Sequence, residues 1–231
     1  MARLRAGVLI SGSGTNLGAL LDAAAAADYP AEIVLVVSNS GDAQGLERAR
    51  AAGVPTRVID HREFPHRAAF DEALSASLGD AGCELVCLAG FMRLLTAGFT
   101  ETWRDRLINI HPSLLPSFKG LDAQARALAA GVAIAGCTVH FVRPEMDAGP
   151  IIVQGAVPVL EGDDAAALAA RILEVEHRIY PLALRLMGEG RVSVAGDVVT
   201  IAENLPGDVV TIAGDRPAAT ETLIWPPENR G

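Results

Sequence analysis

The chain has 231 residues, half of them apolar, which suits one domain of ordinary to large size with a sizeable core. Its formal net charge of −9 argues against a general nucleic-acid binder, although local arginines can still hold small anionic substrates. No apolar run reaches the roughly 18 residues of a membrane span without polar interruption, so no membrane-spanning segment is expected.

Three cysteines, Cys83, Cys87 and Cys137, lie in apolar surroundings. They cannot all pair with one another, so we predict buried thiols in a reducing cytoplasm. Cys83 and Cys87 are four residues apart, but no second pair follows at zinc spacing, so no metal is expected. The N-terminus lacks the long apolar region and cleavage site of a signal peptide.

The first 110 residues alternate continuous apolar runs with helical patterns. Strands are predicted at 6–11, 32–38, 56–60, 85–90 and 107–110, and helices at 16–27, 43–53, 67–79 and near 99–106. This alternation is typical of an α/β fold with a mostly parallel, doubly wound, Rossmann-like sheet that is covered by helices on both faces.

A glycine-rich turn, "SGSGTN" at 11–16, joins the first predicted strand to the first helix. Glycines at such a place let backbone N–H groups approach an anion at a helix N-terminus. The turn is not a dinucleotide fingerprint, because Leu17 replaces the third glycine and no acid ends the second strand. It is not a Walker loop either, because no lysine is near. A phosphate cradle and an ordinary capped turn both remain open at this point.

The stretch "NIHPSLLP" at 109–116 places an amide and an imidazole two residues apart. Residues i and i+2 of an extended segment share a face, so Asn109 and His111 project side by side. Pro112 keeps the segment extended. Two donors that converge on one point suit a developing oxyanion, although a polar strand end that satisfies loop backbone groups is the alternative.

Further strands are predicted at 137–142 and 151–159, and they are close enough to pair antiparallel at one edge of the sheet. Asp147 lies in the Gly/Pro-rich loop between them. A carboxylate beside His111 would favour the charged imidazole and fix its orientation, but a turn aspartate that caps its own backbone is equally compatible with the sequence.

A helix with an aspartate N-cap is predicted over 162–187, with Pro181 kinking or interrupting it. "GDVVTIA" then occurs twice, at 196–202 and 207–213, and the two copies are expected to form a small β-hairpin. We divide the chain into a catalytic domain at 1–190 and a C-terminal extension at 191–231, packed on the same domain.

Three unusual loops follow the first, fourth and fifth predicted strands: the glycine turn, "GFMRLL" at 90–95, and "NIHPS" at 109–113. In a parallel sheet, all three lie at the carboxyl edge, where open α/β sheets bind ligands. Their coincidence on one edge makes a functional site more credible than any one loop does.

In order and spacing, "LISGSGTNL", "LAGFMRLL", "INIHPSLLPSFKG", "AGCTVHFV" and "MDAGPIIVQ" resemble the phosphoribosylglycinamide formyltransferase family over residues 5–190. The resemblance implies the formyltransferase variant of the Rossmann-like fold. It also implies transfer of a formyl group from 10-formyltetrahydrofolate to the amine of glycinamide ribonucleotide, in purine synthesis, without a metal. It further implies a monomer or homodimer in the cytoplasm, with small-molecule substrates as the only partners.

The same resemblance implies roles for individual residues. The implied catalytic residues are Asn109, His111 and Asp147. The residues implied to bind the ribonucleotide are Gly14, Thr15, Asn16 and Glu176. Those implied to bind the folate are Arg67, Met92, Arg93, Leu94, Leu95 and Asn109. Without the family, Met92, Leu94 and Leu95 would be assigned to the core, and Arg67 and Glu176 to solvated helix faces.

Three alternatives are considered. A formyltetrahydrofolate hydrolase shares the motifs but carries an N-terminal regulatory domain, for which the early first strand leaves no room. A methionyl-tRNA formyltransferase needs a C-terminal RNA-binding region, whereas 192–231 has six acids and two arginines. A non-catalytic nucleotide- or nicotinamide-binding protein would not need Asn109, His111 and Asp147 together.

Overall fold

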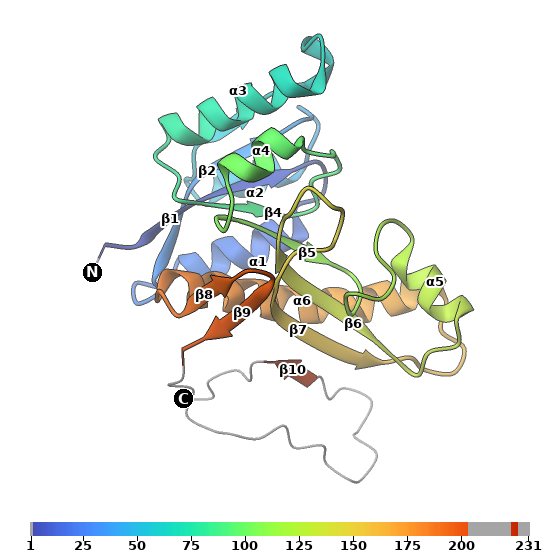
Figure 1. Ribbon diagram of the computed structural model, residues 1–231. Coiled ribbons are helices and arrows are strands. Elements are labelled where there is room, and N and C mark those ends of the chain that lie inside the picture. Colours follow the sequence, from blue (N-terminus) through green and yellow to red (C-terminus); the bar gives the residue numbers. More distant parts are fainter. Residues whose placement is uncertain (1, 203–222, 226–231) are drawn as a thin grey trace.

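The computed structural model describes residues 2–202 and 223–225 (Figure 1). The strands are β1 (Leu4–Ile10), β2 (Ala31–Ser38), β3 (Thr56–Val58), β4 (Leu85–Leu88), β5 (Leu107–His111), β6 (Ile134–Phe141), β7 (Ile151–Pro158), β8 (Val192–Ala195), β9 (Val198–Ile201) and β10 (Leu223–Trp225). The helices are α1 (Thr15–Ala24), α2 (Gly45–Ala51), a 3-10 turn η1 (His61–Glu63), α3 (Arg67–Asp80), α4 (Ala97–Thr102), α5 (Ala123–Ala129) and α6 (Ala165–Gly188).

Within the described residues, eight strands form one sheet in the order β10-β7-β6-β5-β4-β1-β2-β3. The five strands from β5 to β3 are parallel, whereas β6, β7 and β10 continue the sheet antiparallel. The mostly parallel sheet with an antiparallel edge is therefore confirmed. The carboxyl ends of β1, β4 and β5 lie side by side, which brings the three unusual loops to one edge.

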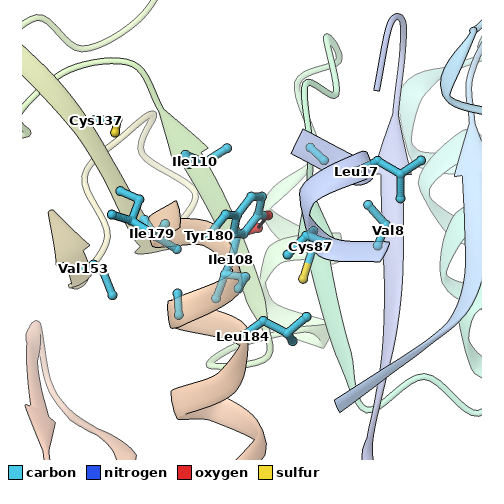
Figure 2. Close-up of a cluster of buried hydrophobic side chains, with 14 of the residues drawn as sticks. Val8, Leu17, Cys87, Ile108, Ile110, Cys137, Val153, Ile179, Tyr180 and Leu184 are labelled. Carbon is cyan, nitrogen blue, oxygen red and sulfur yellow. Dashed lines mark hydrogen bonds between the residues drawn. The ribbon is translucent and has the colours of Figure 1, made fainter. Parts of the chain in front are cut away.

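Helices cover both faces of the sheet (Figure 1). The strands that are buried on both faces split their side chains between two cores: Val8 of β1 packs with α1, α2 and α6, whereas Leu9 packs with α3 and α4. Figure 2 shows Tyr180 of α6 close to Ile108 of β5 and Cys87 of β4. Successive apolar residues of these strands face opposite sides of the sheet, and each side packs against helices. The result is a three-layer architecture.

The predicted interruption of the last helix at Pro181 is wrong, because α6 runs as one helix through that residue. Proline removes one backbone donor, but the neighbouring Tyr180 and Ala183 are fully buried and hold the turn in place. The Pro181 carbonyl also accepts a hydrogen bond of 2.6 Å from the Tyr29 hydroxyl. The predicted aspartate cap is confirmed: Asp164 accepts from the backbone N–H of Ala167.

A C-terminal hairpin is present, but its strands differ from those predicted. The first copy of "GDVVTIA" supplies β9, which pairs antiparallel with β8 across the Gly196–Asp197 turn. Gly196 has φ of 62°, the left-handed conformation that a two-residue hairpin turn requires. The second copy, at 207–213, lies outside the described residues. Helix α5 was not predicted at all.

The prediction of buried thiols is confirmed: Cys83, Cys87 and Cys137 are all free cysteines in the interior. Burial raises the pKa of Cys83 to about 11 and that of Cys87 to about 12, so both are protonated at neutral pH. Over residues 2–202 and 223–225, no helix combines the length and apolar character needed to cross a bilayer.

Candidate active site

The carboxyl end of β5 presents the amide and the imidazole at the carboxyl edge of the parallel strands. Ile108 and Ile110 point into the core, while Asn109 remains partly exposed and His111 is only 6% exposed. Strand β5 is fixed from both sides, by β4 in parallel and by β6 in antiparallel register. Asn109 and His111 therefore stand on one rigid, extended segment, as the i, i+2 spacing predicts.

Both ring nitrogens of His111 face hydrogen-bond acceptors. Nε2 lies 3.0 Å from the carbonyl oxygen of Phe118, which can only accept, so Nε2 carries a proton. Nδ1 lies 3.4 Å from Oδ2 of Asp147. An imidazole with an acceptor at each nitrogen has all its polar atoms satisfied when both nitrogens are protonated.

The Asp147 carboxylate is brought to His111 by the loop between β6 and β7. Asp147 has φ of 50°, a left-handed conformation that is uncommon outside glycine. A Cβ on Gly149 would lie 1.8 Å from the Phe141 carbonyl oxygen, so only glycine lets the loop return this close to β6. The backbone N–H of Gly120 donates to Oδ2 of Asp147 at 2.8 Å, which fixes the carboxylate beside the imidazole.

A second histidine, His140 on β6, completes the cluster, and the sequence interpretation did not include it. It stands opposite Asn109 in the β5–β6 register and is 2% exposed. Its Nδ1 donates to the carbonyl of Phe141 at 2.9 Å. Burial lowers its pKa to about 4, so the ring is neutral and Nε2 bears a lone pair.

That lone pair orients the Asn109 amide. Nδ2 of Asn109 lies 3.3 Å from Nε2 of His140, which must accept, so one amide N–H points at His140 and the other is left for a ligand. The signal in the sequence was a histidine inside the otherwise apolar run "CTVHFV". Its partner could be found only once the antiparallel register of β5 and β6 was known.

We predict that His140 makes the protein less stable in acid. Its pKa falls from 6.5 unfolded to about 4 folded, so the unfolded chain binds more protons between these values. The free energy of unfolding therefore decreases as pH falls from 6.5 to 4, by at most about 3 kcal/mol from this group. Between pH 7 and pH 4.5, the free energy of unfolding measured with urea should decrease less for His140→Asn than for the parent.

The comparison between variant and parent is needed because Glu176 acts in the opposite direction. Burial raises the pKa of its carboxyl, so its protonation favours the folded state as pH falls. Glu176 is present in both proteins, and its effect cancels in the difference. Equal acid losses in the parent and the His140→Asn variant would contradict the neutral assignment of His140.

The glycine turn places Gly14, Thr15 and Asn16 at the N-terminus of α1. Gly14 caps the helix with φ of 67°, and a Cβ there would lie 2.6 Å from the Cα of Gly45 in α2. Only glycine allows this close approach of the two backbones. Thr15 begins the helix and is partly exposed, so the helix N-terminus, with its free backbone N–H groups, lies at the carboxyl end of β1.

The structure joins Asn16 to Glu176, two residues that lie 160 positions apart. Nδ2 of Asn16 donates to Oε2 of Glu176 at 2.7 Å, and both side chains are buried. Burial raises the pKa of Glu176, and the Asn16 hydrogen bond partly offsets this rise. Oδ1 of Asn16 is buried without a hydrogen-bond partner, although the residue is 9% exposed. A buried orphan acceptor of this kind marks a place for a ligand donor.

The segment after β4 lies beside the glycine turn, because the Met92 N–H donates to the Ser11 hydroxyl at 2.8 Å. Met92 is 69% exposed and Leu94 57% exposed, so neither belongs to the core. Arg93 is exposed and Leu95 partly buried. Arg67 begins α3 with an exposed side chain, and it is not among the residues that the contacts above bring together.

The C-terminal hairpin also reaches the site. A cavity of about 420 Å³ is lined by Asp147 and Lys119 on one side and by Asp197 and Val198 of the hairpin on the other. Nothing in the sequence pattern placed the hairpin here. Among the residues that the structure describes, no group of three or more His, Cys, Asp or Glu side chains is suited to hold a metal ion.

The chain matches the model of the formyl transferase family over residues 4–184. It is 43% identical over 187 residues to a phosphoribosylglycinamide formyltransferase of Escherichia coli (strain K12), which covers 81% of this chain and 88% of that protein. A crystal structure of glycinamide ribonucleotide transformylase 1 from Symbiobacterium toebii has a TM-score of 0.85 and 53% identity, with 87% of this chain and 95% of that chain covered.

Two further relatives are longer than this chain. The trifunctional purine biosynthetic protein adenosine-3 of Gallus gallus is 52% identical over 192 residues, covering 83% of this chain but only 19% of that protein. The chain thus spans about a fifth of such relatives. A formyltetrahydrofolate deformylase from Burkholderia mallei has a TM-score of 0.79 at 30% identity, with 87% of this chain and 71% of that chain covered. With its fold, its motifs and near full-length relatives in agreement, the chain belongs to the formyl transferase family, among the phosphoribosylglycinamide formyltransferases.

Proposed function

We propose that the protein transfers the formyl group of 10-formyltetrahydrofolate to the amine of glycinamide ribonucleotide. The products are formylglycinamide ribonucleotide and tetrahydrofolate. The observation that carries this proposal is the convergence of Asn109, His111 and Asp147 at the carboxyl edge, with the imidazole 3.4 Å from the carboxylate. The near full-length relatives named phosphoribosylglycinamide formyltransferase support the ribonucleotide as the acceptor of the formyl group.

In the proposed reaction, the ribonucleotide amine attacks the formyl carbon, and negative charge develops on the formyl oxygen. The free N–H of Asn109 and the N–H of protonated His111 stabilise this charge. In the structure, the Phe118 carbonyl occupies Nε2–H of His111, so a formyl oxygen must share or replace that contact. The carbon–nitrogen bond to the folate then breaks as a proton passes from the attacking amine to the leaving nitrogen.

Asp147 has two tasks in this mechanism. Its carboxylate beside Nδ1 holds the His111 ring in the orientation that stabilises an oxyanion and supplies a counter-charge to the imidazolium of the proposed reaction. Its position next to the reacting groups also suits it to help the proton move, through water, between the two nitrogens. Neither step requires a metal or a covalent intermediate.

The two substrates approach from neighbouring loops. The ribonucleotide phosphate binds at the N-terminus of α1, on Gly14, Thr15 and Asn16, with Glu176 facing the glycinamide portion. The helix N-terminus supports the phosphate placement, because its free backbone N–H groups can donate to an anion. The orphan Oδ1 of Asn16 is an acceptor, so it suits an N–H or O–H donor of the ribonucleotide rather than its phosphate.

The folate lies against the segment from Met92 to Leu95, with Asn109 and Arg67 as polar contacts. The 69% exposure of Met92 and the 57% exposure of Leu94 support this placement, because exposed apolar side chains next to a polar site suit a flat heterocycle.

We predict that Asn16→Ala raises the KM for the ribonucleotide about tenfold while the KM for the folate changes less. The substitution removes an amide from the helix N-terminus and leaves the buried Glu176 carboxyl without its partner. The loss of a hydrogen bond to such a group is worth about 1.5–3 kcal/mol. Initial-rate kinetics with each substrate varied in turn give both constants. A larger rise for the folate would contradict the placement.

The test of the proposed function is an assay of the purified protein with both substrates, followed by the same assay without the ribonucleotide. Formation of tetrahydrofolate should require the ribonucleotide and should match the formylated product in amount. Formyl release at the same rate without the ribonucleotide would instead make the protein a 10-formyltetrahydrofolate hydrolase, the alternative that the deformylase likeness keeps in view.

We further propose that the protein works in the cytoplasm as a monomer or homodimer. Three protonated, buried thiols are compatible with a reducing compartment. Analytical ultracentrifugation gives the oligomeric state directly.

A further inference from the structure

A chain of hydrogen bonds runs from the folate-lining segment into the protein, through residues that the proposed reaction does not use. The Met92 N–H donates to Oγ of Ser11 at 2.8 Å, and Ser11 donates to Oδ1 of Asn39 at 2.5 Å. Nδ2 of Asn39 in turn lies 3.4 Å from Nδ1 of His61. These residues come from the ends of β4, β1, β2 and β3, so the chain crosses the carboxyl edge of four strands.

Asn39 is the junction of this chain and is 7% exposed. A buried amide needs partners at both ends, and here the oxygen takes Ser11 while the nitrogen takes His61. Nδ1 of His61 also lies 3.7 Å from Oδ1 of Asp60, which holds the ring in place. The contact with His61 fixes the orientation of the Asn39 amide, and Asn39 fixes the orientation of the Ser11 hydroxyl.

A second, apolar path joins the same two places. The His61 ring meets the edge of Phe70 in α3, with centroids 6.2 Å apart. Phe70 then stacks on Phe91 at 6.5 Å with an interplanar angle of 10°. Phe91 directly precedes Met92. Both series of contacts therefore begin at His61 and end at the start of the 91–95 segment.

We infer that His61, Asn39 and Ser11 are positioning residues that hold the root of the 91–95 segment against the glycine turn and so set the affinity for the folate. This inference rests on the proposed function for the identity of the ligand. Ser11 is also the first residue of the turn proposed to bind the ribonucleotide. The network therefore fixes the spacing between the two substrate loops without touching either substrate.

The experiment compares kinetic constants of Ser11→Ala, Asn39→Leu and His61→Leu with those of the parent. Each substitution removes one link, and His61→Leu retains an apolar side chain against Phe70. The KM for the folate should rise about three- to tenfold, the loss expected for one neutral hydrogen bond, while the KM for the ribonucleotide stays within about twofold. Ser11→Thr, which retains the hydroxyl, should restore most of the folate affinity.

The matched control is Glu63→Ala, two residues after His61. Glu63 is exposed, and its side chain takes no part in the contacts described above. It should leave both KM values unchanged. The double variant Ser11→Ala/Asn39→Leu should be no worse than the worse single variant, because both break the same chain. Full additivity, or equal rises of both KM values, would overturn the inference.

A separate readout does not depend on turnover. Hydrogen exchange of the Met92 amide should be faster in Asn39→Leu than in the parent by about the factor that the folate KM rises, with α3 protection unchanged. Slow Met92 exchange in a folded Asn39→Leu variant would overturn the network itself. Failure of the proposed function would appear instead as a parent protein that does not transfer formyl groups, with the exchange result intact.

Discussion

The His111→Ala variant should fold normally and lose formyl transfer by at least about a hundred- to a thousandfold in kcat. His111 is the charged donor to the developing oxyanion in the proposed reaction, and loss of one such donor costs about 3–4 kcal/mol in the transition state. Single-turnover rates with both substrates saturating measure the effect directly, because they exclude changes in binding.

Two controls separate a catalytic role from a structural one. His111 forms a hydrogen bond with the Phe118 carbonyl and lies 3.4 Å from the Asp147 carboxylate, so its loss can loosen the 117–122 segment. Circular dichroism and the binding of the ribonucleotide alone should therefore be measured on the same preparation, and both should match the parent. His111→Asn, which offers a neutral donor, should retain more activity than His111→Ala. Turnover near that of the parent in His111→Ala would reject the proposed mechanism.

The architecture of the sheet could be predicted because its signals are local. Continuous apolar runs such as "VLI" in β1 and "LVCL" in β4 are buried on both faces, and that pattern belongs to parallel strands between helices. The place of the site followed from the same pattern, because parallel strands end at one edge. The short spacing between β6 and β7 likewise gave the antiparallel edge, which is confirmed.

What could not be predicted depends on contacts between distant segments. His140 acquires its role only because the β5–β6 register sets it opposite Asn109. Asn16 meets Glu176 only because α6 packs against α1. The repeated "GDVVTIA" suggested that its two copies pair, but β9 instead pairs with the four-residue strand β8, because the two-residue turn at Gly196 and Asp197 joins them directly. Local similarity between two strands does not decide which strands pair.

The two carboxylate oxygens of Asp147 have different neighbours. Oδ2 accepts from the Gly120 N–H at 2.8 Å, while Oδ1 lies 3.7 Å from Nε2 of His140. His140 is neutral with its proton on Nδ1, so Oδ1 faces a lone pair and gains no hydrogen bond there. An asparagine at this position can keep its oxygen on the Gly120 N–H, but its NH₂ group gains no partner at His140, whose one lone pair already accepts from Asn109.

Asp147→Asn should therefore lower activity far more than stability. We expect kcat to fall about a hundredfold or more, because the amide supplies no negative charge beside His111 and cannot help the proton move between the two nitrogens. The free energy of unfolding should stay within about 1 kcal/mol of the parent, because the Gly120 N–H keeps its acceptor. Single-turnover rates and urea unfolding at pH 7 measure both effects. A variant that loses stability in proportion to activity would show that the carboxylate supports the loop rather than the reaction.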